Sequence, residues 1–211
     1  MSLMVADMVD KSTILTGLVS NASRAKVDLR GALANGVASA GAVDQNGASL
    51  ALGTPVFYLE VPSIGIHEAV VEGTTSSTLF GGPGHRRDTV LPGQAGTSVV
   101  MGRRSTFGGP FGRLPELKKG DSITATTAQG AYTFAVLDVR RDGQPMPAAP
   151  AAQHSRLVLI TAGGSTFFPS GLVYVDADLK GDATGGPAPI HSAASLPNAE
   201  RPMEGDSRTV W

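Results

Sequence analysis

The chain has 211 residues, enough for one domain with extensions and above the size at which a hydrophobic core needs disulfides or metals to be stable. Its 17 Lys and Arg residues nearly balance 18 Asp and Glu residues, giving a formal net charge of -1 without long runs of one sign, so we expect no nucleic-acid binding. The sequence has no Cys, which excludes disulfides, thiolate metal ligands and any cysteine mechanism for the chain as it stands. No apolar run approaches the roughly 20 residues of a membrane-spanning helix.

The first 50 residues are predicted to form a helical arm and a linker. Between Ile14 and Val37 the apolar residues recur at roughly helical spacing, which predicts one or two amphipathic helices. Residues 41–53 are mostly Gly, Ala, Asn and Ser, a composition typical of a loop. The sequence leaves open whether these helices pack on the domain that follows.

Short strands separated by turn signals are predicted over residues 51–180. The chain contains 27 Gly and 14 Pro, so turns must be abundant and long helices rare. Leu157–Ile160 is apolar on both faces, which predicts a central strand. Seven or eight short strands at this spacing predict a mainly β domain, a barrel or a sandwich, with short helices near residues 76–80 and 111–117. The candidate strands cover residues 54–62, 67–73, 97–102, 121–127, 131–140, 156–161 and 172–179.

From Gly181 on, the chain is rich in Gly, Pro, Ala and Ser and poor in large apolar residues. Such a segment buries too little apolar surface to offset the conformational entropy that it loses on ordering. We therefore predict a flexible C-terminal tail over residues 181–211.

Four local motifs occur in one collinear order within the predicted barrel or sandwich. They are VPSIGI at residues 61–66, GPGH at 82–85, LPGQ at 91–94 and GGPF at 108–111. In this order and spacing they resemble the bacterial sortases, which are membrane-anchored cysteine transpeptidases that join proteins to the cell wall or to pilins. The resemblance implies a sortase-like eight-stranded β-barrel with short helices and an N-terminal helical arm. It also implies a Gram-positive, extracytoplasmic protein at the face of the membrane and cell wall, held by an anchor outside the 211 residues.

The resemblance also identifies three catalytic positions, and each carries a residue that differs from the family's. The ungapped frame GRRSTFGGPF puts Arg103 in the place of the general acid/base His, while Ala162 replaces the nucleophilic Cys and Gly171 the catalytic Arg. A register slip of one residue would move the last position to Ser170 or Leu172, and neither is an Arg. Ala162 has no lone pair to attack a carbonyl, Arg103 stays protonated and cannot act as a base, and Gly171 has no side-chain donor. The resemblance therefore implies a member that lacks the family's Cys/His/Arg set.

Two interpretations as an enzyme remain open. In the first, the nucleophile was replaced deliberately, which explains Ala162 but not the residues at the other two positions. In the second, the hydroxyl of Thr161 or Ser165 is the nucleophile, and His85 is the best available base. The family often carries a His at the place of His85 beside its catalytic one, so the simpler interpretation is that His85 hydrogen-bonds its own loop.

A groove kept from the family would still offer groups that bind a ligand. Arg103 would point into it, and a guanidinium binds a carboxylate or a phosphate through two parallel hydrogen bonds. The alternative for Arg103 is an internal ion pair. The other candidate groove-binding residues are Arg104, His85, Thr161 and Ser165. The isolated His and acidic residues have no spacing typical of metal ligands, so we predict no metal and no cofactor.

The favoured interpretation is a sortase-like cell-envelope protein without catalysis, a pseudoenzyme that binds or scaffolds. Its expected partners are a peptide, a pilin, a cell-wall component or an active sortase. The alternative is a cysteine transpeptidase that attaches proteins to the cell wall or to pili and is inactive in the sequence given.

Overall fold

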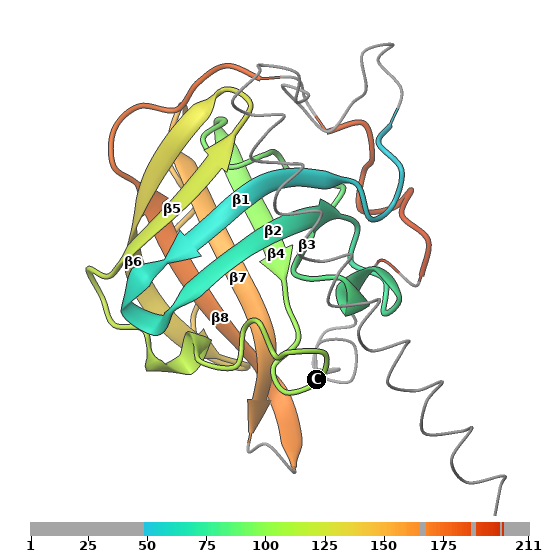
Figure 1. The fold of residues 1–211 in the computed structure, drawn as a ribbon. Coiled ribbons are helices and arrows are strands. Elements are labelled where there is room, and N and C mark those ends of the chain that lie inside the picture. Colours follow the sequence, from blue (N-terminus) through green and yellow to red (C-terminus); the bar gives the residue numbers. More distant parts are fainter. Residues whose placement is uncertain (1–48, 165–167, 187–188, 199, 201–211) are drawn as a thin grey trace, which may run out of the picture.

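The computed structural model describes residues 49–164, 168–186, 189–198 and 200 (Figure 1). The predicted N-terminal helical arm lies outside these residues except for its last two, and it stays a prediction. Within the described part of the chain, no helix is long and apolar enough to cross a membrane.

Eight strands close into a barrel, which confirms the predicted mainly β fold (Figure 1). Their order around the barrel is β1-β2-β3-β4-β7-β8-β6-β5. Closure removes the unpaired strand edges that an open sheet would expose. The strands are β1 (Pro55–Val61), β2 (Ile66–Glu72), β3 (Gly84–His85), β4 (Gly96–Met101), β5 (Ser122–Thr127), β6 (Gly130–Arg141), β7 (Ser155–Gly164) and β8 (Pro169–Leu179).

Strand β7 lies between β4, to which it is parallel, and β8, to which it is antiparallel. The predicted central position of Leu157–Ile160 is therefore confirmed. Leu157 and Leu159 belong to the main core, whereas Val158 and Ile160, whose side chains point to the opposite face, belong to a second apolar cluster. Because both faces are buried, this strand has an unbroken apolar sequence.

The main core is formed by side chains from strands around the whole barrel and from the loop that follows β4. Its largest fully buried side chains are those of Phe57, Phe111 and Phe134. Three single-turn 3-10 helices connect the strands, and two of them lie inside the regions predicted to be helical. They are η1 (Pro62–Ile64), η2 (Thr78–Phe80) and η3 (Leu114–Glu116).

Part of the predicted C-terminal tail contacts the barrel. The backbone N–H of Thr184 donates to the carbonyl oxygen of Gly93 at 2.8 Å, and Leu196 and Glu200 are only 2% and 3% exposed. The composition of residues 181–211 predicts a flexible segment. Thr184, Leu196 and Glu200 nevertheless have specific surroundings, because one buried Leu and a few polar contacts hold this part of the chain although it has no core of its own. The division of the chain into arm, barrel and tail stays a prediction.

Candidate functional site

The candidate site lies where β4 and β7 end side by side. In these parallel strands Met101 of β4 is level with Ile160 of β7. Beyond that pair the N–H of Gly102 donates to the carbonyl oxygen of Ile160 at 3.0 Å, and Thr161 Oγ1 donates to the carbonyl oxygen of Gly102 at 2.9 Å. The two chains thus stay bonded past the end of β4, which places Arg103 beside the end of β7.

Ala162, which the sequence resemblance predicts to stand at the nucleophile's position, has no exposed surface. It pairs with Leu172 of β8 and belongs to the second apolar cluster. Its carbonyl oxygen accepts a hydrogen bond from Arg104 Nη1 at 2.9 Å. The side chain is a buried methyl group, so neither its chemistry nor its position permits attack on a substrate carbonyl.

Gly171, which the sequence resemblance predicts to stand at the position of the catalytic Arg, has a backbone conformation that favours glycine. Its φ is 63°, in the left-handed region, and a Cβ added there would lie 2.6 Å from Asp142 Oδ2. The same carboxylate oxygen accepts a hydrogen bond from the N–H of Leu172 at 2.7 Å. Asp142 therefore occupies the space in which a side chain at residue 171 would begin.

Arg103, which the sequence resemblance predicts to stand at the position of the general acid/base, is held by groups from two loops. Nη2 donates to the carbonyl oxygen of Ser76 at 3.0 Å, and Nη1 donates to Thr106 Oγ1 at 3.2 Å. The guanidinium carbon lies 4.7 Å from the ring centroid of Phe80 and 5.1 Å from that of Phe107, within the range of cation–π attraction. Arg103 is 7% exposed, and this burial lowers the pKa of its guanidinium, although an Arg side chain stays protonated at neutral pH.

The two rings over Arg103 form an aromatic pair that faces solvent. Phe80 ends η2 and Phe107 lies in the loop after β4, and their stacked rings have centroids 4.3 Å apart. Phe80 is 43% exposed and Phe107 is 52% exposed. The φ of Phe107 is 53°, which is uncommon for a bulky residue. Sequence reasoning missed this pair because the two residues are distant in the chain and Phe80 belongs to none of the motifs.

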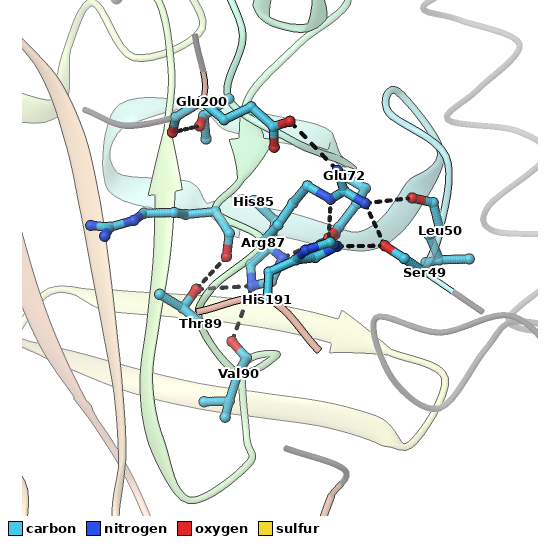
Figure 2. A network of polar contacts seen from close by, with 11 residues as sticks. Ser49, Leu50, Glu72, His85, Arg87, Thr89, Val90, His191 and Glu200 are labelled. Atoms are coloured by element: carbon cyan, nitrogen blue, oxygen red, sulfur yellow. Dashed lines mark hydrogen bonds and ion pairs between the residues drawn. The ribbon is translucent and has the colours of Figure 1, made fainter. Parts of the chain in front are cut away.

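His85 lies away from this site. Its ring is fully buried, with Nδ1 3.0 Å from Glu72 Oε2 and Nε2 3.1 Å from the carbonyl oxygen of Val90 (Figure 2). Through β4, His85 is level with Leu159, three residues before Ala162, which is about 10 Å along β7 at the usual rise of a strand. His85 therefore contacts β2 and its own loop and does not face the end of β7.

The other predicted groove residues are engaged with the backbone or lie outside the described part of the chain. Thr161 is fully buried, and its hydroxyl donates to Gly102. The half-buried Arg104 holds the backbone of Ala162. Ser165 lies outside the described residues, so its role stays a prediction.

The site can bind through charge and stacking. Its described side chains are the guanidinium groups of Arg103 and Arg104, two phenyl rings, the Ala162 methyl group and the Thr161 hydroxyl, and none of these is a general acid or base near neutral pH. Among the residues that the structure describes, no three His, Cys, Asp or Glu side chains gather as metal ligands would.

Comparisons of the sequence with known proteins connect this geometry to one family. The family model of the sortase domain matches residues 59–170, just over half of the chain. Sortase D of Bacillus subtilis (strain 168) is 31% identical over 102 residues, which are 48% of this chain and 50% of that relative. The match therefore spans about half the length of the curated relative.

Solved sortase structures share the barrel. A sortase D transpeptidase of Clostridium perfringens has a TM-score of 0.60 at 18% identity, covering 77% of this chain and 99% of that one. Sortase E of Streptomyces avermitilis has a TM-score of 0.51 at 26% identity, covering 72% and 100%. Sortase C-1 of Actinomyces oris has a TM-score of 0.54 at 25% identity, covering 60% and 75%. The family-model match, supported by the common barrel, shows that this chain belongs to the sortase family.

Proposed function

We propose that this chain is a non-catalytic sortase-family protein that binds a peptide, a pilin, a cell-wall component or an active sortase at the extracytoplasmic face of the cell envelope. The observation that carries the proposal is the buried methyl group of Ala162 at the position of the nucleophile. Without a nucleophilic atom no acyl intermediate forms, so covalent transpeptidation has no first step. The placement at the envelope rests on the family, whose members are generally associated with it.

Arg103 and Gly171 support the same proposal. A positioned general acid or base typically contributes about a hundred- to ten-thousandfold in rate, and a protonated guanidinium cannot act as the base. Loss of one oxyanion donor costs about a hundred- to a thousandfold, and Gly171 offers no side-chain donor. Restoring a single residue would leave the other two deficits in place.

The alternative is a cysteine transpeptidase whose nucleophile was replaced. A Cys at residue 162 would have the cation of Arg104 hydrogen-bonded to its backbone carbonyl oxygen, while its side chain would lie in the second apolar cluster. The described residues around Ala162 present no His to protonate the leaving amine. This alternative therefore explains one altered position and leaves the acid/base step without a group.

A relocated nucleophile at Thr161 with His85 as its base is disfavoured by the contacts of these two residues. Thr161 is buried and donates to Gly102, so its oxygen does not face a substrate. His85, the proposed base, is enclosed by Glu72 and its own loop.

The test measures binding and turnover in the same samples. Wild type, Ala162→Cys and the matched control Ala162→Ser are titrated with sorting-signal peptides and wall-stem peptides by NMR, and products are sought by mass spectrometry. We expect saturable shifts near Ala162 and Arg103 without cleaved or transferred peptide in any of the three proteins.

Each other outcome overturns the proposal in a distinct way. Product from Ala162→Cys alone would establish the replaced-nucleophile alternative, and product from wild type would establish a different nucleophile. Absence of both binding and product would mean that the domain serves only as a structural element. Arg103→Ala then locates the ligand, because a loss of about tenfold in affinity is expected only if the ligand contacts the guanidinium.

A further inference from the structure

A row of polar side chains, buried except for the half-buried Arg87, joins the barrel to the C-terminal strap, which we define as residues 189–198 and 200 (Figure 2). The row begins at His85, continues through Glu72 and Arg87, and ends at Glu200. None of these residues occupies one of the three family positions, so the proposed function does not explain them.

The end of the strap is fixed to the barrel at Glu200. Glu200 Oε1 lies 3.5 Å from Arg87 Nη1, and its carbonyl oxygen accepts a hydrogen bond from Thr74 Oγ1 at 3.0 Å (Figure 2). Its N–H donates to the carbonyl oxygen of Pro197 at 2.9 Å, which closes a turn next to Leu196. Leu196 and Glu200 are 2% and 3% exposed, as deeply buried as residues of the core.

The barrel side of this contact is oriented mainly by residues outside the strap, and Ser49 Oγ also lies 2.9 Å from Nε2 of the strap's own His191 (Figure 2). Arg87 Nε lies 3.8 Å from Glu72 Oε1, and Nη2 donates to Ser49 Oγ and, at 3.3 Å, to the carbonyl oxygen of Leu50. These partners belong to β2 and to the segment that leads into β1. They hold the guanidinium in place and leave Nη1 for a carboxylate such as that of Glu200.

The contact is deeply buried but incompletely satisfied. A buried carboxylate is costly unless it is paired and hydrogen-bonded. The 3.5 Å ion pair of Glu200 is longer than the usual charge-assisted hydrogen bond of about 2.7–2.9 Å. Among the described residues, Glu200 Oε2 has no hydrogen-bond partner. Docking thus leaves one buried carboxylate oxygen without a hydrogen bond among the described residues, a cost that favours displacement of the segment by a competitor.

We propose that Thr74, Arg87 and the surroundings of Leu196 form a peptide-docking site on the barrel, which the chain's own strap occupies reversibly. The site takes a polypeptide segment that offers an aliphatic side chain and, four residues later, a carboxylate. A partner protein with this pattern displaces the strap. Ser76, two residues after Thr74, accepts a hydrogen bond from Arg103, so the exchange acts on a loop that covers the candidate site.

The first test uses a fluorescein-labelled peptide of residues 189–204 and measures its anisotropy with the full chain. The double variant Leu196→Ser/Glu200→Gln should release the strap and leave Arg87 intact. The peptide should therefore bind to this variant at least tenfold more tightly than to wild type, in which the strap competes for the same site. A tenfold difference in affinity corresponds to roughly 1.4 kcal/mol. Adding Arg87→Gln to the released variant should remove the gain. Adding Arg86→Gln instead is the matched control and should keep it, because Arg86 pairs within its own loop.

Hydrogen exchange gives a second measurement that does not depend on the double variant. In wild type the amide of Glu200, which is hydrogen-bonded to Pro197, should be protected from exchange. In Glu200→Gln the amide at residue 200 should exchange about tenfold faster, and the exchange rates of the β7 amides should stay unchanged. Equal peptide binding by wild type and the released variant, or equal exchange, overturns the proposal. Turnover of sorting peptides tests the proposed function separately, so the two failures are distinguishable.

Discussion

Arg104 Nη1 donates a hydrogen bond to the carbonyl oxygen of Ala162, with the two atoms 2.9 Å apart. The bond ties the loop after β4 to the end of β7, at the residue that the sequence resemblance predicts for the nucleophile. Nearby, the hydroxyl of Thr161 makes a second tie, to Gly102. The end of β7 is thus held to the segment after β4 by two hydrogen bonds.

Replacing Arg104 with Ala should lower the free energy of unfolding by about 1 kcal/mol, because a hydrogen bond from a charged donor is lost at a half-buried position. Urea denaturation followed by circular dichroism measures the change. Arg141→Ala, at an exposed position, is the matched control and should leave the denaturation midpoint unchanged. Equal effects of the two substitutions would show that the bond to Ala162 contributes nothing.

Gly171→Ala should destabilise the barrel by about 1–2 kcal/mol, because φ is in the left-handed region, where a Cβ is strained. The added methyl group would also approach Asp142 Oδ2 at 2.6 Å. Gly185→Ala is the control, since a Cβ there meets nothing within 4 Å. Thermal unfolding compares the two variants, and a smaller loss at residue 171 than at residue 185 would contradict the prediction. The same strain means that Gly171→Arg would not rebuild a catalytic Arg without cost.

The alternation of apolar and polar residues predicted most of the barrel. The strand ends that it predicted for β1, β2 and β4 differ from the observed ends by one residue. Larger differences occur where β7 and β8 extend into a hairpin, at Gly164 and Pro169, because glycine and proline give no strand signal of their own. At these two residues the pairing of β7 with β8, and not the local sequence, determines where the strands end.

Strand β3 could not be predicted from its own residues. Gly84 and His85 lie in a stretch rich in Gly and Pro, which indicates a loop, and they become a strand only by pairing with β2 and β4. A Cβ at Gly84 would lie 2.1 Å from the carbonyl oxygen of Gly73, so this close approach requires glycine. The contact of Arg103 with the rings of Phe80 and Phe107 could not be predicted either, because only the fold brings the loop after β2 next to the loop after β4.

The aromatic pair should stabilise Arg103 measurably. Phe107→Leu removes one cation–π contact and the ring stack with Phe80, and we expect a loss of about 0.5–1 kcal/mol in the free energy of unfolding. In an Arg103→Met background the loss should shrink, because the cation is absent, and urea denaturation of the four proteins of this double-mutant cycle measures the coupling. Phe168→Leu, at a residue that is 79% exposed, serves as the control. An unchanged loss in the Met background would mean that Phe107 acts by apolar packing alone.

The ion pair of Arg140 and Asp176 should matter far more for stability than the exposed pair of Arg113 and Glu116. Arg140 Nε lies 2.6 Å from Asp176 Oδ2, both residues are buried, and the guanidinium also lies 4.2 Å from the ring centroid of Tyr174. Asp176→Ala leaves this cation buried and unpaired, so we expect a loss of about 3–5 kcal/mol, whereas Arg140→Met/Asp176→Leu should lose much less. In the exposed pair, the hydrogen bond from Arg113 lowers the pKa of Glu116, yet Glu116→Gln should leave the urea midpoint unchanged because both side chains are more than half exposed. Equal losses from Asp176→Ala and the double variant would show that the buried cation finds another partner.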